Sequence, residues 1–176
     1  MLDLARAALV GSVIHLPLPE VCVTSEILTA YRACFVTLTR NGELRGCVGQ
    51  LISQLPLFQA VMENVRRAAS RDPRFPPLQP QELGNITIEI TVVTEPRALS
   101  FSSPEELLAL LQPQEHGVLL SLGPAIATFL PQVWEQIPDK IEFLERLSQK
   151  LGGPVSAWRS KQACVSVYHA EWFAEN

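Results

Sequence analysis

Two extended segments joined by Asn41-Gly42 constrain the fold of this chain more than any other feature. Residues 34–39, with the sequence Cys-Phe-Val-Thr-Leu-Thr, are rich in β-branched and apolar residues, which predicts a strand. Asn-Gly is the strongest short-range hairpin signal, because both residues tolerate the positive φ angles of a two-residue type I′ turn. Residues 44–51 are then predicted to return as an antiparallel strand.

The remaining segments alternate between helical and extended patterns. Apolar spacing and capping residues predict four helices, over residues 2–14 and 56–70, after Ser103 and after Asp139. The proline-containing segment 15–19 is predicted to end the first helix. Alternating or β-branched segments predict further strands, over residues 86–93, 117–122, 125–130 and 163–173. The expected fold is α/β (α+β), with a mixed, mainly antiparallel sheet and flanking helices.

Length and composition indicate one globular domain over residues 1–176, or two small lobes sharing a core. The chain has 176 residues, of which 47% are hydrophobic and 18% charged. Its net charge of -4 lacks the basic excess of a general nucleic-acid binder. The apolar segment 2–14 contains Asp3 and Arg6 and is too short to span a bilayer. No basic leader or cleavage site indicates secretion, so we expect a cytoplasmic protein with neither nucleic-acid nor membrane partners.

The four cysteines form no close pair of the kind found in zinc knuckles or thioredoxin-like motifs. We therefore expect reduced thiols, no metal site and no cofactor. A two-residue turn would place Val36 opposite Cys47, and Cys34 opposite Gly49. Residues opposite each other share a face, so Arg45 and Cys47 would lie on the same face as Cys34. A longer loop would change the cross-strand pairs, but Arg45 and Cys47 would still share a face.

The segment around Cys47 has the residue types that a reactive thiol or an anion site requires. A guanidinium such as that of Arg45 favours the thiolate and can also bind a carboxylate or phosphate. Gly46 and Gly49 remove side chains on both sides of Cys47, as happens where a ligand approaches a strand. The structural alternative is a buried cysteine used for packing, with the glycines forming a bulge.

Three further residues are candidates outside the hairpin. Asp72 and Arg74, in the rigid loop after the second helix, are positioned to bind an anion. Alternatively they end the helix and form a local ion pair. His116, at the start of a predicted strand, is the best histidine for general base catalysis, although a lone histidine there is more often structural.

The sequence of residues 35–51, Phe-Val-Thr-Leu-Thr-Arg-Asn-Gly-Glu-Leu-Arg-Gly-Cys-Val-Gly-Gln-Leu, resembles the signature of the AMMECR family, also known as AmmeMemoRadiSam system protein A. Val48 stands where that family has isoleucine. Residues 68–78 and 86–93, together with the later segments 115–120, 129–133 and 143–152, are also similar to family landmarks, so the resemblance covers nearly the whole chain. Cys34 is a departure, because the family usually has alanine at that position.

The resemblance implies an α/β fold with two lobes and a cleft that holds the signature. It also implies an association with a Memo-like protein and a radical SAM protein, and hence a role in a redox or modification pathway. Two hypotheses follow for the chain itself. The first is an enzyme, or an accessory to one, that uses Cys47 as a thiolate stabilised by Arg45. His116 would then be the base, while Asp72 and Arg74 would position a small anionic substrate.

The second hypothesis is a non-catalytic ligand-binding or scaffold module for a partner protein. Arg45, Gly46 and Gly49 would then form the binding surface, and Cys47 would serve packing. The two hypotheses differ in whether the sulfur of Cys47 is open to a ligand or sealed under other side chains.

Overall fold

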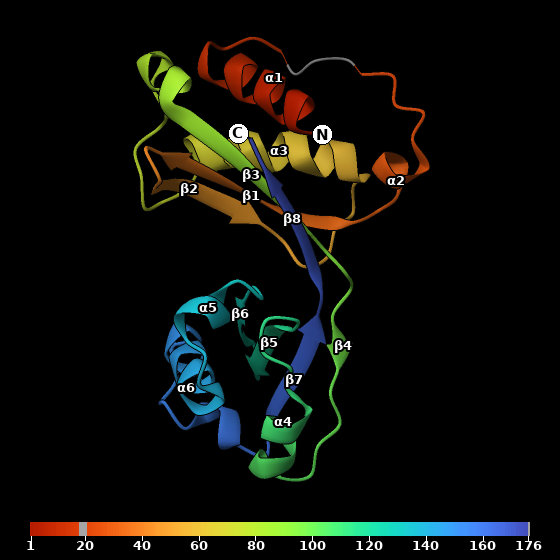
Figure 1. The fold of residues 1–176 in the computed structure, drawn as a ribbon, viewed down its shortest axis with the longest axis vertical. Coiled ribbons are helices and arrows are strands. Elements are labelled where there is room, and N and C mark those ends of the chain that lie inside the picture. The colour runs from red at the N-terminus through yellow and green to blue at the C-terminus, as the bar shows by residue number, and fades with distance from the viewer. Residues whose placement is uncertain (18–20, 176) are drawn as a thin grey trace. The chain divides into compact units, whose positions relative to one another are not determined.

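A computed structural model describes residues 1–17 and 21–175 of the chain, so Leu18 and Pro19 of the predicted helix-ending segment lie outside the described residues. The fold is α/β, as predicted, but it contains two four-stranded antiparallel sheets rather than one sheet. The chain divides into two compact units (Figure 1). Unit 1 comprises Met1–Glu95 and Glu171–Asn176, and unit 2 comprises Pro96–Ala170. None of the helices in the described ranges is long and apolar enough to cross a membrane.

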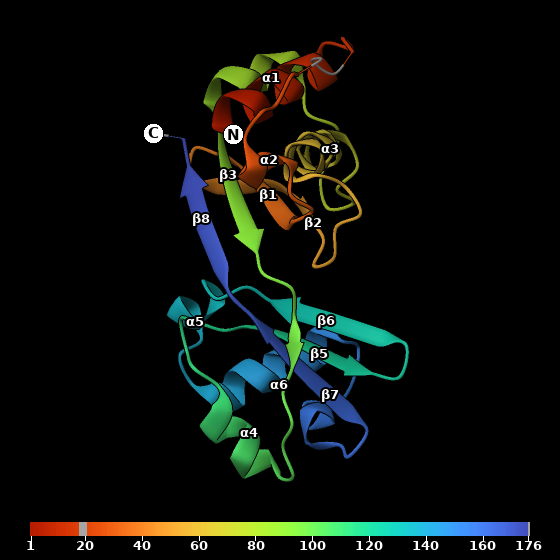
Figure 2. The same cartoon turned by 90° about the vertical axis from the view of Figure 1, so that its right-hand side faces the viewer.

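Unit 1 is a sheet in the order β2-β1-β3-β8 with its long helices on one face (Figures 1 and 2). Its strands are β1 (Ala33–Arg40), β2 (Glu43–Gly49), β3 (Ile86–Val93) and β8 (Ala170–Ala174). Its helices are α1 (Leu2–Val13), the short α2 (Glu26–Thr29), α3 (Leu57–Ser70) and the 3-10 helix η1 (Pro80–Asn85). The helices predicted over 2–14 and 56–70, and the strand predicted over 86–93, are thus confirmed.

The core of unit 1 lies between this sheet and helices α1 and α3. Alternate residues of β1, namely Cys34, Val36 and Leu38, point into it and are fully buried. The isoleucines of β3 extend the same apolar surface, as the alternation in the sequence predicts. The opposite face of the sheet carries Thr37 and Thr39 of β1 and Glu89 of β3, together with Phe35.

Unit 2 contains the second sheet, in the order β4-β7-β5-β6. Its strands are β4 (Arg97–Ala98), β5 (Gly117–Leu122), β6 (Ala125–Phe129) and β7 (Ala163–Tyr168). Its helices are α4 (Pro104–Leu110), α5 (Val133–Gln136), α6 (Lys140–Lys150) and η2 (Ala157–Arg159). Trp134 stacks on Phe143 within the apolar core of this unit, with ring centroids 3.6 Å apart. The predicted caps are present: Ser103 accepts from the backbone N–H of Glu106, and the Asp139 carboxylate caps α6.

The single strand predicted over 163–173 is wrong. The segment divides at His169 into β7, in the sheet of unit 2, and β8, in the sheet of unit 1. No glycine or proline marks the division, because the chain stays extended there and only its neighbouring strands change. A local pattern of extended residues therefore carries no signal for the boundary.

Candidate functional site

The hairpin between β1 and β2 turns where the sequence predicts, but its register differs. Asn41 and Gly42 both have positive φ angles, of 53° and 83°, as a type I′ turn requires. Beyond the turn the register shifts, because Arg45 is an extra residue on β2 and forms a β-bulge. Cys47 consequently lies opposite Thr37, and the predicted pairing of Cys47 with Val36 is wrong.

The bulge places the two cysteines of the hairpin on opposite faces of the sheet. Cys34 points toward α3, where its sulfur accepts a hydrogen bond from the Asn64 amide at 3.4 Å. Burial raises the pKa of the Cys34 thiol to about 11, although the Asn64 hydrogen bond acts in the other direction. Cys47 points to the face away from α3, together with Thr37. The predicted common face of Cys34 and Cys47 is therefore also wrong.

The Cys47 side chain is half-buried in a polar environment. Its sulfur accepts a hydrogen bond from the Thr37 hydroxyl, with an Oγ1–Sγ distance of 3.3 Å. The other free cysteines differ from it: Cys34 is buried, whereas Cys22 and Cys164 are exposed. Cys47 is thus neither sealed in the core nor simply displayed on the surface.

The backbone of Cys47 is held by the loop that follows α3. β2 is an edge strand, and the N–H and C=O groups of Cys47 point away from β1. The Asp72 Oδ2 atom accepts from that N–H at 2.8 Å, and Arg74 Nη2 donates to the carbonyl oxygen at 3.3 Å. These two side chains take the place of a neighbouring strand and block further pairing at this point of the edge.

Asp72 and Arg74, which hold the Cys47 backbone, also form a bidentate ion pair with each other. Arg74 Nε and Nη2 donate to the two carboxylate oxygens of Asp72 at 2.9 and 2.7 Å. The Arg74 hydrogen bond, against the opposing effect of burial, holds the pKa of Asp72 well below its usual range, with help from the Cys47 N–H. The Asp72 hydrogen bond is the main cause that raises the pKa of Arg74, burial acts in the other direction, and Cys47 makes a smaller contribution.

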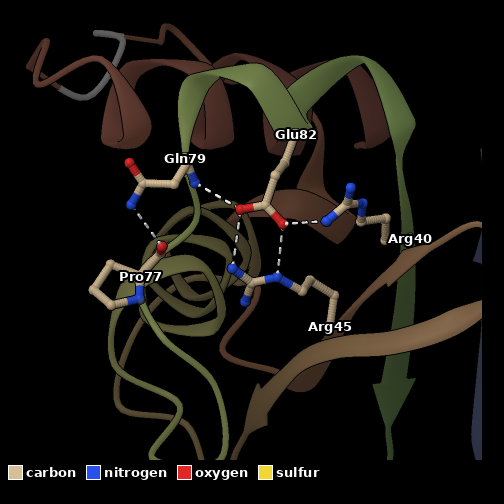
Figure 3. A network of polar contacts seen from close by, with 5 residues as sticks. All are labelled: Arg40, Arg45, Pro77, Gln79 and Glu82. Carbon is tan, nitrogen blue, oxygen red and sulfur yellow. Dashed lines mark hydrogen bonds and ion pairs between the residues drawn. The ribbon is translucent and has the colours of Figure 1, made fainter.

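Arg45 is engaged elsewhere, with Glu82 of η1 (Figure 3). Its Nε and Nη2 atoms donate to the two Glu82 oxygens at 3.0 and 3.1 Å, and Arg40 donates to the same carboxylate. The Arg45 and Glu82 side chains are only 12% and 13% exposed, so this pair anchors the bulge of β2 to η1. The guanidinium that contacts Cys47, at its backbone carbonyl, is therefore that of Arg74, rather than that of Arg45 as the sequence suggested.

The two glycines of the segment face other parts of the chain. Gly46 lies on the helix side of the sheet, where a Cβ would collide with the backbone oxygen of Ala68 in α3. A Cβ on Gly49 would collide with the ring of Phe35 and with the carbonyl oxygen of Cys34. Close packing of the chain itself thus explains why glycine is needed at both positions, while their predicted role in substrate binding stays a prediction.

Thr37 and Glu89, on the same face of the sheet as Cys47, were not identified as site residues from the sequence. Thr37 lies between Cys47 on β2 and Glu89 on β3, so the three residues form one row across three strands. Burial raises the pKa of Glu89, with a Thr91 hydrogen bond acting in the other direction. The alternation of residues 86–93 already put Glu89 on the polar face, but only the bulged register aligns it with Cys47.

His116 belongs to unit 2, at the start of β5, and serves the local structure there. Its Nδ1 atom accepts from the backbone N–H of Gln112 at 3.1 Å, and its carbonyl oxygen accepts from the Trp134 indole at 2.7 Å. Burial, followed by the neighbouring His169, lowers the pKa of its imidazole. Its role as the base for Cys47 stays a prediction.

No group of three or more histidine, cysteine or acidic side chains within residues 1–17 and 21–175 is arranged to hold a metal ion. The fold and the hairpin together define a class of α/β protein with two antiparallel sheets, one of which carries a bulged hairpin with a cysteine held beside an Asp–Arg pair. The AMMECR1 family model matches residues 2–173, and the chain belongs to the AMMECR1 family.

Relatives of the chain occur among archaea. It is 37% identical to a protein of Methanosarcina mazei over 152 residues, which cover 86% of this chain and 75% of that protein. It is 38% identical to a protein of Nanoarchaeum equitans, with 83% of each chain covered. The crystal structure of an uncharacterised protein from Pyrococcus horikoshii superposes with a TM-score of 0.92 at 30% identity, covering 99% of this chain and 89% of that one. The names of these relatives state no activity.

Proposed function

We propose that the chain is a cysteine-dependent enzyme, or an accessory to one, and that Cys47 is its nucleophile toward a small anionic substrate. The observation that carries this proposal is the environment of the Cys47 sulfur. It accepts a hydrogen bond from Thr37 and is half-buried, and the Arg74 guanidinium binds the backbone carbonyl of the same residue. A hydrogen-bond donor and a nearby cation both stabilise negative charge on a sulfur nucleophile.

The residues around Cys47 have distinct roles in this proposal. Asp72 and Arg74 fix the backbone of Cys47, and Arg74 also attracts the negative charge of the substrate. His116 is the proposed base, because a neutral imidazole can accept a proton. Glu89, whose carboxyl pKa is raised by burial, lies two strands from Cys47 in the same row and adds negative charge to that face.

The chemical step is a nucleophilic displacement. The Cys47 proton passes to the base, the sulfur forms a bond to the electrophilic atom of the substrate, and the leaving group departs with the bonding electron pair. The protonated base then supplies the proton that the leaving group needs. Water releases the product from the sulfur in a second displacement.

Charge selectivity of alkylation tests this proposal. Iodoacetate and iodoacetamide differ chiefly in charge, so a cation beside a thiol favours iodoacetate. We expect the iodoacetate-to-iodoacetamide rate ratio to be several-fold higher at Cys47 than at the exposed Cys164 of the same molecule. The variant Arg74→Gln is expected to remove that difference. Equal ratios at the two thiols in the wild-type protein would show that Cys47 has no anion-attracting environment.

The alternative function is a non-catalytic ligand-binding or scaffold module. It is supported by the contacts of Arg45 and Asp72, which bind other parts of the chain and so give the signature segment a structural use. This alternative predicts that Cys47→Ser retains ligand or partner binding while Arg45→Ala abolishes it. The enzyme proposal predicts loss of activity in Cys47→Ser with the fold retained.

A cytoplasmic setting and a place in a redox or modification pathway belong to the same proposal. All four cysteines are free thiols, which suits a reducing compartment. The resemblance to AmmeMemoRadiSam system protein A is the reason for proposing a Memo-like protein or a radical SAM protein as the partner. Co-purification from a native extract, with Cys47→Ser as the matched bait, tests whether such a partner depends on the thiol.

A further inference from the structure

A groove with an unpaired arginine lies on unit 1, away from the Cys47 sulfur. Its lining comes from the connection between β2 and α3, residues 50–55, and from residues 60–67 of α3 itself. Its volume is about 650 Å³, within the range of small-molecule sites. Its lining combines polar residues, Gln50, Gln54, Glu63, Asn64 and Arg67, with the apolar residues Ile52, Leu55 and Ala60.

Arg67 is the half-buried cation of this groove. The neighbouring Arg66 is committed to Glu63, with Nη2 and Oε1 2.9 Å apart and a second hydrogen bond from Nε. The Arg67 guanidinium has no hydrogen-bond or ion-pair partner among residues 1–17 and 21–175. Withdrawing a guanidinium from water without a partner is unfavourable, so an anion in the groove would offset that cost.

Asn64 supplies a second group that a ligand can use. The residue is buried, and its amide nitrogen is fixed by donating to the carbonyl oxygen of Cys34 at 2.9 Å and to the Cys34 sulfur. Its carboxamide oxygen accepts no hydrogen bond from the part of the chain that the structure describes. A fixed acceptor and a half-buried cation thus line the same groove, beside the exposed Ile52.

We propose that this groove binds a small organic carboxylate that also carries an amide N–H and an apolar group. Arg67 receives the carboxylate, since a guanidinium matches its two oxygens. The Asn64 oxygen accepts from the amide N–H, and Ile52 and Leu55 contact the apolar group. The proposal does not depend on the reactivity of Cys47, because Cys34, which anchors Asn64, faces the opposite side of the sheet.

Hippurate is the probe that tests this assignment, because it combines a carboxylate, an amide N–H and a phenyl ring. Titration into the ¹⁵N-labelled full chain is expected to shift the amides of residues 50–55 and 60–67 saturably. The expected dissociation constant is on the order of 1 mM, since ligands of this size bind weakly. Hippuramide, in which an amide replaces the carboxylate, is expected to bind at least about tenfold more weakly.

Matched variants within α3 and at its C-cap distinguish binding in the groove from a general effect of positive charge. Arg67→Gln is expected to weaken hippurate binding about tenfold or more. Arg71→Gln removes the same charge from an exposed residue that does not line the groove, and is expected to leave binding within about twofold of the wild type. Arg67→Lys keeps the charge without the planar fork, so it should bind with intermediate affinity.

The proposal is overturned if hippurate produces no saturable shift in the wild-type protein, or if hippuramide binds equally well. It is also overturned if the Arg67 and Arg71 variants lose affinity equally. Labelling of Cys47 in the same samples keeps this outcome apart from the thiol proposal, because a failed groove would leave Cys47 alkylation unchanged.

Discussion

Replacing Gly46 with alanine places a methyl group against the backbone oxygen of Ala68, near the end of α3. Overpacking of a core usually costs about 1–3 kcal/mol, and the upper end applies here because a helix backbone does not rotate away as a side chain does. Alanine also lowers the entropy of the unfolded chain, which offsets about 0.4–1 kcal/mol of that cost. We therefore expect Gly46→Ala to lower the free energy of unfolding of unit 1 by about 2 kcal/mol.

Gly84→Ala is the matched control, since an added Cβ there meets no atom within 4 Å. We expect this variant to lie within about 1 kcal/mol of the wild type, toward higher stability. Pulsed alkylation of Cys34 in increasing urea is the suitable assay, because this thiol is buried in unit 1 and reports its unfolding separately from unit 2. A midpoint for Gly46→Ala equal to that of Gly84→Ala would refute the packing explanation.

Three further predictions concern the contacts around the hairpin. Asp72→Asn is expected to lower the free energy of unfolding by about 2 kcal/mol at pH 7, because it breaks the ion pair with Arg74. Urea unfolding at several pH values measures this difference. The pKa of Asp72 is lower in the folded state than its usual value of about 4. The wild type therefore keeps its full excess in free energy of unfolding over Asp72→Asn above about pH 4, and loses that excess as the pH falls further. Glu82→Gln is expected to lower the free energy of unfolding by about 1–3 kcal/mol. In a double-mutant cycle with Arg45→Gln, most of this loss should appear as the coupling free energy between Arg45 and Glu82. Cys34 should react with iodoacetamide only on unfolding, as burial excludes the reagent and raises the thiol pKa to about 11; mass spectrometry of the labelled peptide checks this.

The elements of unit 1 were predictable where local residues decide the outcome. Asn41-Gly42 fixes the turn through backbone φ angles, and the alternation of residues 86–93 fixes the buried face of β3. The glycines indicated a bulge as one alternative, but its position at Arg45 was not predictable in this way, because its anchor, Glu82, lies far along the chain. One extra residue moved Cys47 to the face opposite Cys34, so every statement about shared faces across the hairpin changed with it.

The candidate site residues show the same difference between what local sequence determines and what contacts between distant segments determine. The sequence correctly raised a local ion pair as one interpretation of Asp72 and Arg74, since both lie in one short loop. Their contacts with the backbone of Cys47 depend on the open edge of β2, which only the sheet order reveals. The pairing of Thr37 with both Cys47 and Glu89 likewise depends on the register of two separate strand pairs.

The alkylation rate of Cys47 in the native protein, relative to those of Cys34 and Cys164, tests the central claim most directly. Peptide mass spectrometry after timed iodoacetamide labelling, repeated from mildly acidic to alkaline pH, gives all three rates in one molecule. We predict that Cys47 reacts faster than the more exposed Cys164 at and below neutral pH, and that Thr37→Val lowers its rate selectively. If Cys47 remains unlabelled until the protein unfolds, as Cys34 should, then its thiol serves packing and the proposed nucleophile is contradicted.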